Sequence, residues 1–98
     1  NTFEFEKNLR IQILIQKSEI YFVQRNYKEA YFYSKQIYDK APYQALLYSD
    51  PGDILLAWGK TKEAKQFWIK NLSGPELPGK IKSLIQNKLD IIKILKTK

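Results

Sequence analysis

Apolar residues recur at intervals of three and four positions along most of this chain, and this spacing indicates amphipathic α-helices. The pattern predicts helices from the first residues to about Gln24 and over residues 27–40, 60–72 and 80–96. The stretches YQALLY and ILLAW are also helical in pattern, but SDPGD lies between them, so we expect a helix that is kinked or interrupted near Pro51. No stretch has the pattern of a convincing strand, and the predicted fold class is therefore all-α.

Start and stop signals agree with these limits. Asn1 and Glu4 have the three-residue spacing of a helix-start pair, in which the asparagine side chain accepts a backbone amide proton. Asp50 and Pro51 resemble the cap and the first residue of a helix. Gly59 has the position of a C-terminal stop, so the helix that contains ILLAW is expected to end there.

An internal repeat with an offset of 34 residues runs through the chain. YKEA starts at Tyr27 and TKEA starts at Thr61. The same offset matches small residues with small ones and apolar residues with apolar ones: Ser18 with Gly52, Tyr21 with Leu55, and Ala30 with Ala64. A shared tetrapeptide alone is weak evidence, but a register that continues across both helices of a hairpin indicates a true repeat.

This pattern resembles the tetratricopeptide repeat, a helix–turn–helix unit of the same length. On this resemblance residues 11–44 form a first unit and residues 45–78 form a second unit. Residues 79–98 resemble the solvation helix that commonly follows a final repeat and covers its exposed apolar face. The resemblance implies one domain over residues 1–98, an α-solenoid of antiparallel helix hairpins with a C-terminal capping helix.

The resemblance also implies which residues hold the hairpins together. In the family, small residues mark the point where the two helices of a unit come closest. We therefore expect Ser18 to face Ala30 in the first unit, and Gly52 to face Ala64 in the second. A larger side chain at such a point would overpack the crossing. The implied repeat-packing residues are Ser18, Tyr21, Ala30, Gly52, Ala64 and Trp68.

Members of this family often bind a peptide in the concave groove that the first helices of the repeats line. The groove positions of this chain are largely apolar and mildly acidic, and the implied partner-binding residues are Gln12, Ile15, Glu19, Phe22, Val23, Asp53 and Leu56. Some relatives clamp a terminal carboxylate with a lysine and an asparagine, but Ile15 and Glu19 occupy those positions here, so we do not expect that mode. The alternative for Phe22 and Val23 is packing against a neighbouring repeat or the end helix.

The amino-acid composition limits the catalytic and metal-binding chemistry open to this chain. The chain has 98 residues and is 44 % hydrophobic, which suits one packed domain. It contains no cysteine and no histidine, so disulfides and thiolate metal sites are excluded and the usual general base is missing. Asp50 and Asp53 are the nearest thing to paired carboxylates, and capping is their expected role. We expect a non-catalytic protein without a metal or a cofactor.

The net charge of +7 belongs entirely to the C-terminal part of the chain. Residues 1–59 are neutral overall, whereas residues 60–98 hold ten lysines and three acidic residues. Such a surface can solubilise a helix, attract an acidic protein, or bind nucleic acid or an anionic surface. Nucleic acid is the less favoured partner because Phe67 and Trp68 fall at core positions of the repeat; a steep loss of affinity with salt would support it.

The expected function is that of a scaffold or adaptor that holds a protein or peptide partner. The alternatives are a basic module that binds nucleic acid or an anionic surface, and an accessory domain of an enzyme. Two units fall below the usual number of about three repeats. We therefore expect upstream repeats or a partner protein to cover the open N-terminal edge, which Phe3 and Phe5 mark.

The first residues lack an initiator methionine, and we interpret the chain as a piece of a longer protein. It has no basic-then-apolar leader and no apolar stretch near the ~20 residues of a membrane helix, so we expect a soluble protein of the cytoplasm or the periplasm. The bias toward lysine, isoleucine, asparagine and tyrosine is typical of an AT-rich bacterial coding sequence.

Overall fold

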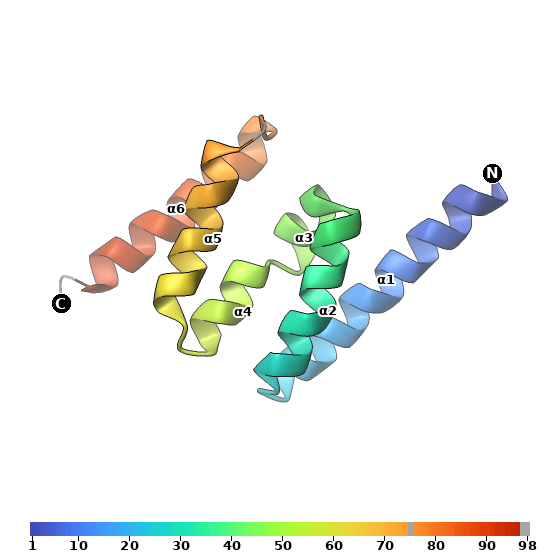
Figure 1. Ribbon diagram of the computed structural model, residues 1–98, viewed down its shortest axis with the longest axis horizontal. Coiled ribbons are helices and arrows are strands. Elements are labelled where there is room, and N and C mark those ends of the chain that lie inside the picture. The colour runs from blue at the N-terminus through green and yellow to red at the C-terminus, as the bar shows by residue number, and fades with distance from the viewer. Residues whose placement is uncertain (75, 97–98) are drawn as a thin grey trace.

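The computed structural model describes residues 1–74 and 76–96, and helices account for most of them (Figure 1). In chain order the helices are α1 (Thr2–Val23), α2 (Tyr27–Lys40), α3 (Pro42–Tyr48), α4 (Pro51–Ala57), α5 (Thr61–Ser73) and α6 (Gly79–Lys96). The described residues contain no strand, so the predicted all-α class is confirmed. The predicted interruption near Pro51 is also confirmed, because α3 and α4 are separate helices.

The helices pack mainly as neighbours along the chain. α1 and α2 form one antiparallel hairpin, and α4 and α5 form a second one (Figure 1). α2 packs against both α3 and α4 and so joins the two hairpins, while α6 packs on α5 and also contacts α3. The fold is thin, with extents of 51 × 33 × 15 Å. None of the described helices is long and apolar enough to span a bilayer.

Local signals set the helix ends as expected. The Asn1 side chain accepts a hydrogen bond from the Glu4 amide at 2.9 Å, which caps α1. The Asp50 side chain accepts from the Gly52 amide at 2.8 Å and caps α4 in the same way. Gly59 has a φ of +84°, a conformation that favours glycine, and it reverses the chain between α4 and α5.

The first hairpin is held together by a close helix contact and a small apolar core. The buried Ser18 hydroxyl donates a hydrogen bond to the Ala30 carbonyl at 3.1 Å, so the two small residues lie against each other. One turn further along α1, Tyr21 stacks on Tyr33 of α2 with ring centroids 5.7 Å apart. The apolar core of this half consists of Ile11, Ile37 and Ala45.

The second core lies between the α4–α5 hairpin and α6. Its buried residues are Leu46, Leu55, Ala64, Trp68, Ile81, Ile85 and Ile92. Trp68 is completely buried at its centre. The spacing of apolar residues in α6 predicts that Leu95 is buried with Ile81, Ile85 and Ile92, but Leu95 is 62 % exposed. That expectation was wrong because the last turn of α6 runs away from α5 (Figure 1).

The small residue at position 52 is explained by Trp68. A methyl group on Gly52 would overlap the indole ring of Trp68, which has no room to move because it is enclosed by the core. Gly52 therefore lets α4 approach the ring of α5 at van der Waals distance. Ala64, the residue predicted to face Gly52, is buried one helical turn before Trp68 in the same core.

We expect Gly52→Ala to lower the free energy of unfolding by about 1–3 kcal/mol, because the added methyl overpacks the Trp68 ring. Gly79→Ala is the matched control, since nothing lies within 4 Å of a methyl group added there. Urea unfolding followed by circular dichroism measures both variants. Equal stability of the two variants would contradict this account of Gly52.

Candidate functional site

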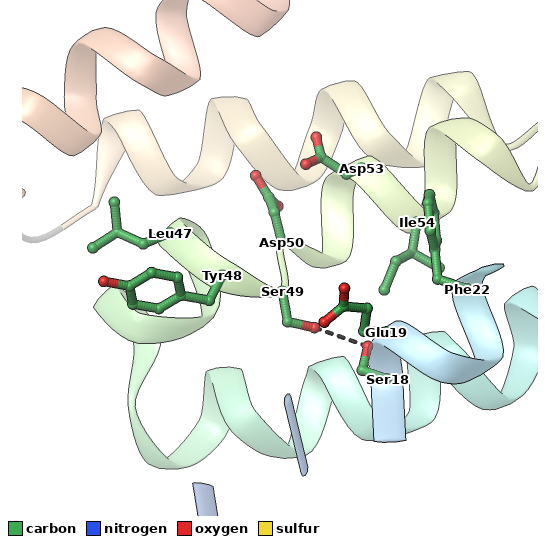
Figure 2. Close-up of a pocket in the computed structure, with 9 residues that line it drawn as sticks. All are labelled: Ser18, Glu19, Phe22, Leu47, Tyr48, Ser49, Asp50, Asp53 and Ile54. Atoms are coloured by element: carbon green, nitrogen blue, oxygen red, sulfur yellow. Dashed lines mark hydrogen bonds between the residues drawn. The ribbon is translucent and has the colours of Figure 1, made fainter. Parts of the chain in front are cut away.

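A groove separates α1 from the junction between α3 and α4. It encloses a cavity of about 290 Å³ (Figure 2). The lining residues come from α1, α3, the α3–α4 junction and α4, and are Ser18, Glu19, Phe22, Leu47, Tyr48, Ser49, Asp50, Asp53 and Ile54. Two non-helical residues, Ser49 and the extended Asp50, form the junction itself. The groove thus lies where the first hairpin meets the second.

A chain of buried hydroxyl groups forms the floor of the groove. The Ser49 hydroxyl donates to the Ser18 hydroxyl at 2.8 Å, as the dashed line in Figure 2 shows. Ser18 in turn donates to the Ala30 carbonyl, and Ser34 of α2 donates to the Ser49 carbonyl. This carbonyl is available because the helix is interrupted after Ser49. The floor is therefore rigid, and its polar groups are paired within the protein.

The rim of the groove combines apolar surface with negative charge. Tyr48 is 67 % exposed, and Leu47 and Phe22 are also exposed. Glu19 lies on the exposed side of α1 and lines the same cavity. A surface of this kind can bury an apolar side chain and attract a positive charge beside it.

Asp50 connects the junction to the second hairpin and to α6. Its side chain accepts hydrogen bonds from the Gly52 amide at 2.8 Å and from the Trp68 indole nitrogen at 3.0 Å. The Lys88 ammonium of α6 donates to the same carboxylate at 2.8 Å. The Asp50 side chain is only 2 % exposed, so these three donors replace water as its partners.

Lys88 also pairs with a second carboxylate. Its ammonium nitrogen lies 2.9 Å from Asp53, whose side chain is 47 % exposed. Burial and the nearby Asp50 carboxylate raise the pKa of Asp53, and Lys88 partly counteracts this. Burial lowers the pKa of Lys88, but the charges and hydrogen bonds of Asp50 and Asp53 outweigh burial and raise it above the usual 10.5. Lys88 is therefore a fixed cation of the fold.

The structure brings together three of the seven residues predicted to bind a partner: Glu19, Phe22 and Asp53 line the groove. The other four lie elsewhere: Gln12 is exposed on α1, Ile15 packs against the core of the first hairpin, Leu56 packs against the second core, and Val23 lies on the outer face of α1. The groove therefore contains fewer of these residues than the sequence predicted.

Sequence reasoning missed Leu47, Tyr48 and Lys88. Leu47 and Tyr48 reach the rim because α3 ends before Asp50, and the interruption predicted near Pro51 was the signal that this helix departs from a regular unit. Lys88 is one of many lysines in residues 60–98, and no local pattern separates it from the others. Its two partners lie 35 and 38 residues away in the chain.

Comparison with known proteins returns no relative. No protein-family model, no curated protein and no solved structure matches this chain. The resemblance to the tetratricopeptide repeat thus depends on the residues quoted above. Function has to be inferred from the groove and from the surfaces around it.

We expect Lys88→Met to lower the free energy of unfolding by about 2–3 kcal/mol, because the buried Asp50 side chain loses its paired cation. Asp53→Asn is the matched comparison. Asp53 is half-exposed and its neutral amide no longer repels Asp50, so we expect a change within about 1 kcal/mol. Urea unfolding at neutral pH measures both. A smaller loss for Lys88→Met than for Asp53→Asn would contradict the role assigned to Asp50.

The raised pKa of Lys88 predicts a pH dependence of stability. The folded protein holds this proton more tightly than the unfolded chain, so the stabilisation is complete below the usual 10.5 and is lost as the pH rises through the folded pKa. The difference in free energy of unfolding between wild type and Lys88→Met should shrink above pH 10.5. Tyrosine titration is common to both proteins and cancels in the difference. A difference in free energy of unfolding that stays constant above pH 10.5 would refute the link between Lys88 protonation and stability.

Proposed function

We propose that this chain is a non-catalytic protein-interaction domain of tetratricopeptide-like construction, which binds a peptide segment of another protein in its groove. Two observations support the tetratricopeptide-like part. The offset of 34 residues relates the α1–α2 hairpin to the hairpin that ends with α5. Small buried residues lie at the helix contact of each hairpin: Ser18 with Ala30 in the first, and Gly52 in the second.

The observation that carries the binding proposal is the convergence of both units on one cavity. Glu19 and Phe22 come from the first helix of the first unit, and Asp53 comes from the corresponding helix of the second. All three occupy positions that a tetratricopeptide-like repeat directs to its groove. Their meeting at one groove supports the view that the groove is a binding surface.

The chemistry of the groove describes its partner. A cavity of about 290 Å³ is at the small end of ligand pockets and suits one or two side chains of a peptide. Phe22, Leu47 and Tyr48 favour an aliphatic or aromatic anchor. Glu19 favours a lysine or arginine next to that anchor, because opposite charges attract. The polar groups of the floor are already hydrogen-bonded within the protein, so they add no further requirement.

The alternative of nucleic-acid binding has less support. Trp68 is completely buried and therefore offers no surface on which a base could stack. Lys88 is held by two carboxylates. The excess of lysine on residues 60–98 lies on the part of the chain that does not line the groove.

Selection from a library of randomised displayed peptides tests the proposal. We expect enriched peptides to combine an apolar anchor with a neighbouring lysine or arginine. Tyr48→Ala and Glu19→Lys should each weaken binding of an enriched peptide about tenfold, the first by loss of contact area and the second by reversed charge. Ile69→Ala, on the exposed side of α5, is the control and should bind as wild type does.

Two results would contradict the proposal. One is enrichment of no peptide family by the folded protein. The other is an enriched peptide whose affinity is unchanged in both Tyr48→Ala and Glu19→Lys. The second result would place the binding surface outside the groove.

A further inference from the structure

The α4 side of the groove already holds a positive charge that belongs to the protein. Asp50 and Asp53 line the groove cavity, and the Lys88 ammonium of α6 lies 2.8 Å from the first carboxylate and 2.9 Å from the second. Lys88 itself is not among the residues that line the cavity, and its side chain is only 21 % exposed. One cluster of charges thus connects the groove to α6.

The two carboxylates of this cluster differ in what they can offer to a bound peptide. Asp50 is 2 % exposed and accepts hydrogen bonds from the Gly52 amide, the Trp68 indole and Lys88, so its partners are all within the protein. Asp53 keeps 47 % of its side chain exposed while it pairs with Lys88. Asp53 is therefore the carboxylate that a peptide in the groove can reach.

The charge that such a peptide meets depends on Lys88. The pKa of Lys88 is raised above the usual 10.5, because the charges and hydrogen bonds of the two carboxylates outweigh burial, so the ammonium keeps its charge at neutral pH. When both carboxylates are ionised, the cluster carries two negative charges and one positive charge. A cation that approaches Asp53 is attracted by the carboxylates and repelled by Lys88, and over a few ångströms these effects partly cancel.

Lys88 also shows which chemical group this part of the groove accepts. It is a lysine ammonium within hydrogen-bond distance of both Asp50 and Asp53. The lysine or arginine that Glu19 favours in a peptide carries the same kind of charge. A peptide cation at Asp53 would therefore compete with Lys88 for one carboxylate.

We propose that Lys88 limits the attraction of the groove for basic peptides, because it occupies the carboxylate that a lysine or arginine of the peptide would otherwise pair with. This inference rests on the proposed function of the groove. It makes α6 an internal competitor of the partner, which acts through the charge of Asp53 and not by filling the cavity. Lys88 then discriminates between partners by their charge and not by their apolar anchor.

Two peptides and one variant test the proposal. The first is a basic peptide enriched in the selection described above, and the second is the same peptide with its lysine or arginine replaced by norleucine. Calorimetric titration at mildly alkaline pH, where carboxylates are ionised, measures both affinities. Lys88→Met should bind the basic peptide about threefold more tightly than wild type and the norleucine peptide equally well. A purely structural role of Lys88 would weaken both peptides.

A second variant covers the case in which Lys88→Met does not fold. Asp53→Asn removes the reachable carboxylate and leaves the Lys88 charge in place. It should bind the basic peptide about threefold more weakly than wild type and the norleucine peptide equally well. Circular dichroism checks the fold of each variant. Tyr48→Ala should weaken both peptides, which shows that they bind in the groove.

The outcomes separate this inference from the proposed function. If Tyr48→Ala weakens both peptides but Asp53→Asn binds the basic peptide as wild type does, the inference is overturned and the proposed function stands. The same holds if a folded Lys88→Met binds the basic peptide no more tightly than wild type. Enrichment of no peptide by the folded protein would overturn the proposed function and this inference with it.

Discussion

The structure depends on the interruption of one helix between Ser49 and Asp50. These two residues are not helical, and each ties the junction to a different part of the fold. Ser49 accepts a hydrogen bond from Ser34 through its carbonyl and donates one to Ser18 through its hydroxyl, which anchors the first hairpin. Asp50 caps α4 and accepts the indole hydrogen bond of Trp68, which anchors the second. A continuous helix would occupy the Ser49 carbonyl and remove half of these contacts.

The carboxylate at this junction also explains the position of α6. A buried negative charge is costly unless it is paired, and Asp50 is paired with Lys88 across 38 residues of chain. Because Lys88 reaches Asp53 as well, α6 is held at two points on the first turn of α4. The ammonium group lies 5.7 Å from the centre of the Trp68 ring, so the cation, the carboxylate and the indole form one compact unit.

Two exposed surfaces arise from differences between the two units of the sequence repeat. Where the second unit has Pro51 in place of Lys17, the helix is interrupted, and Leu47 and Tyr48 turn outward to form the rim of a groove. Where the first unit has no preceding hairpin among the described residues, Ile20 stays exposed on the outer face of α1. The second unit thus lacks the continuous helix of the first, and the first unit lacks the neighbouring hairpin of the second.

The sequence by itself determined the all-α class, the helix limits and the caps, since these depend on neighbours within a few residues, as in the pairing of Asn1 with Glu4. It also indicated three of the residues that line the groove, Glu19, Phe22 and Asp53, because a repeat carries position from one unit to the next. Only the tertiary structure decided that Lys88 joins Asp50, or that Tyr48 forms the rim. Those outcomes depend on the angle between helices at the interruption and on residues far apart in the chain, and no local pattern encodes either of them.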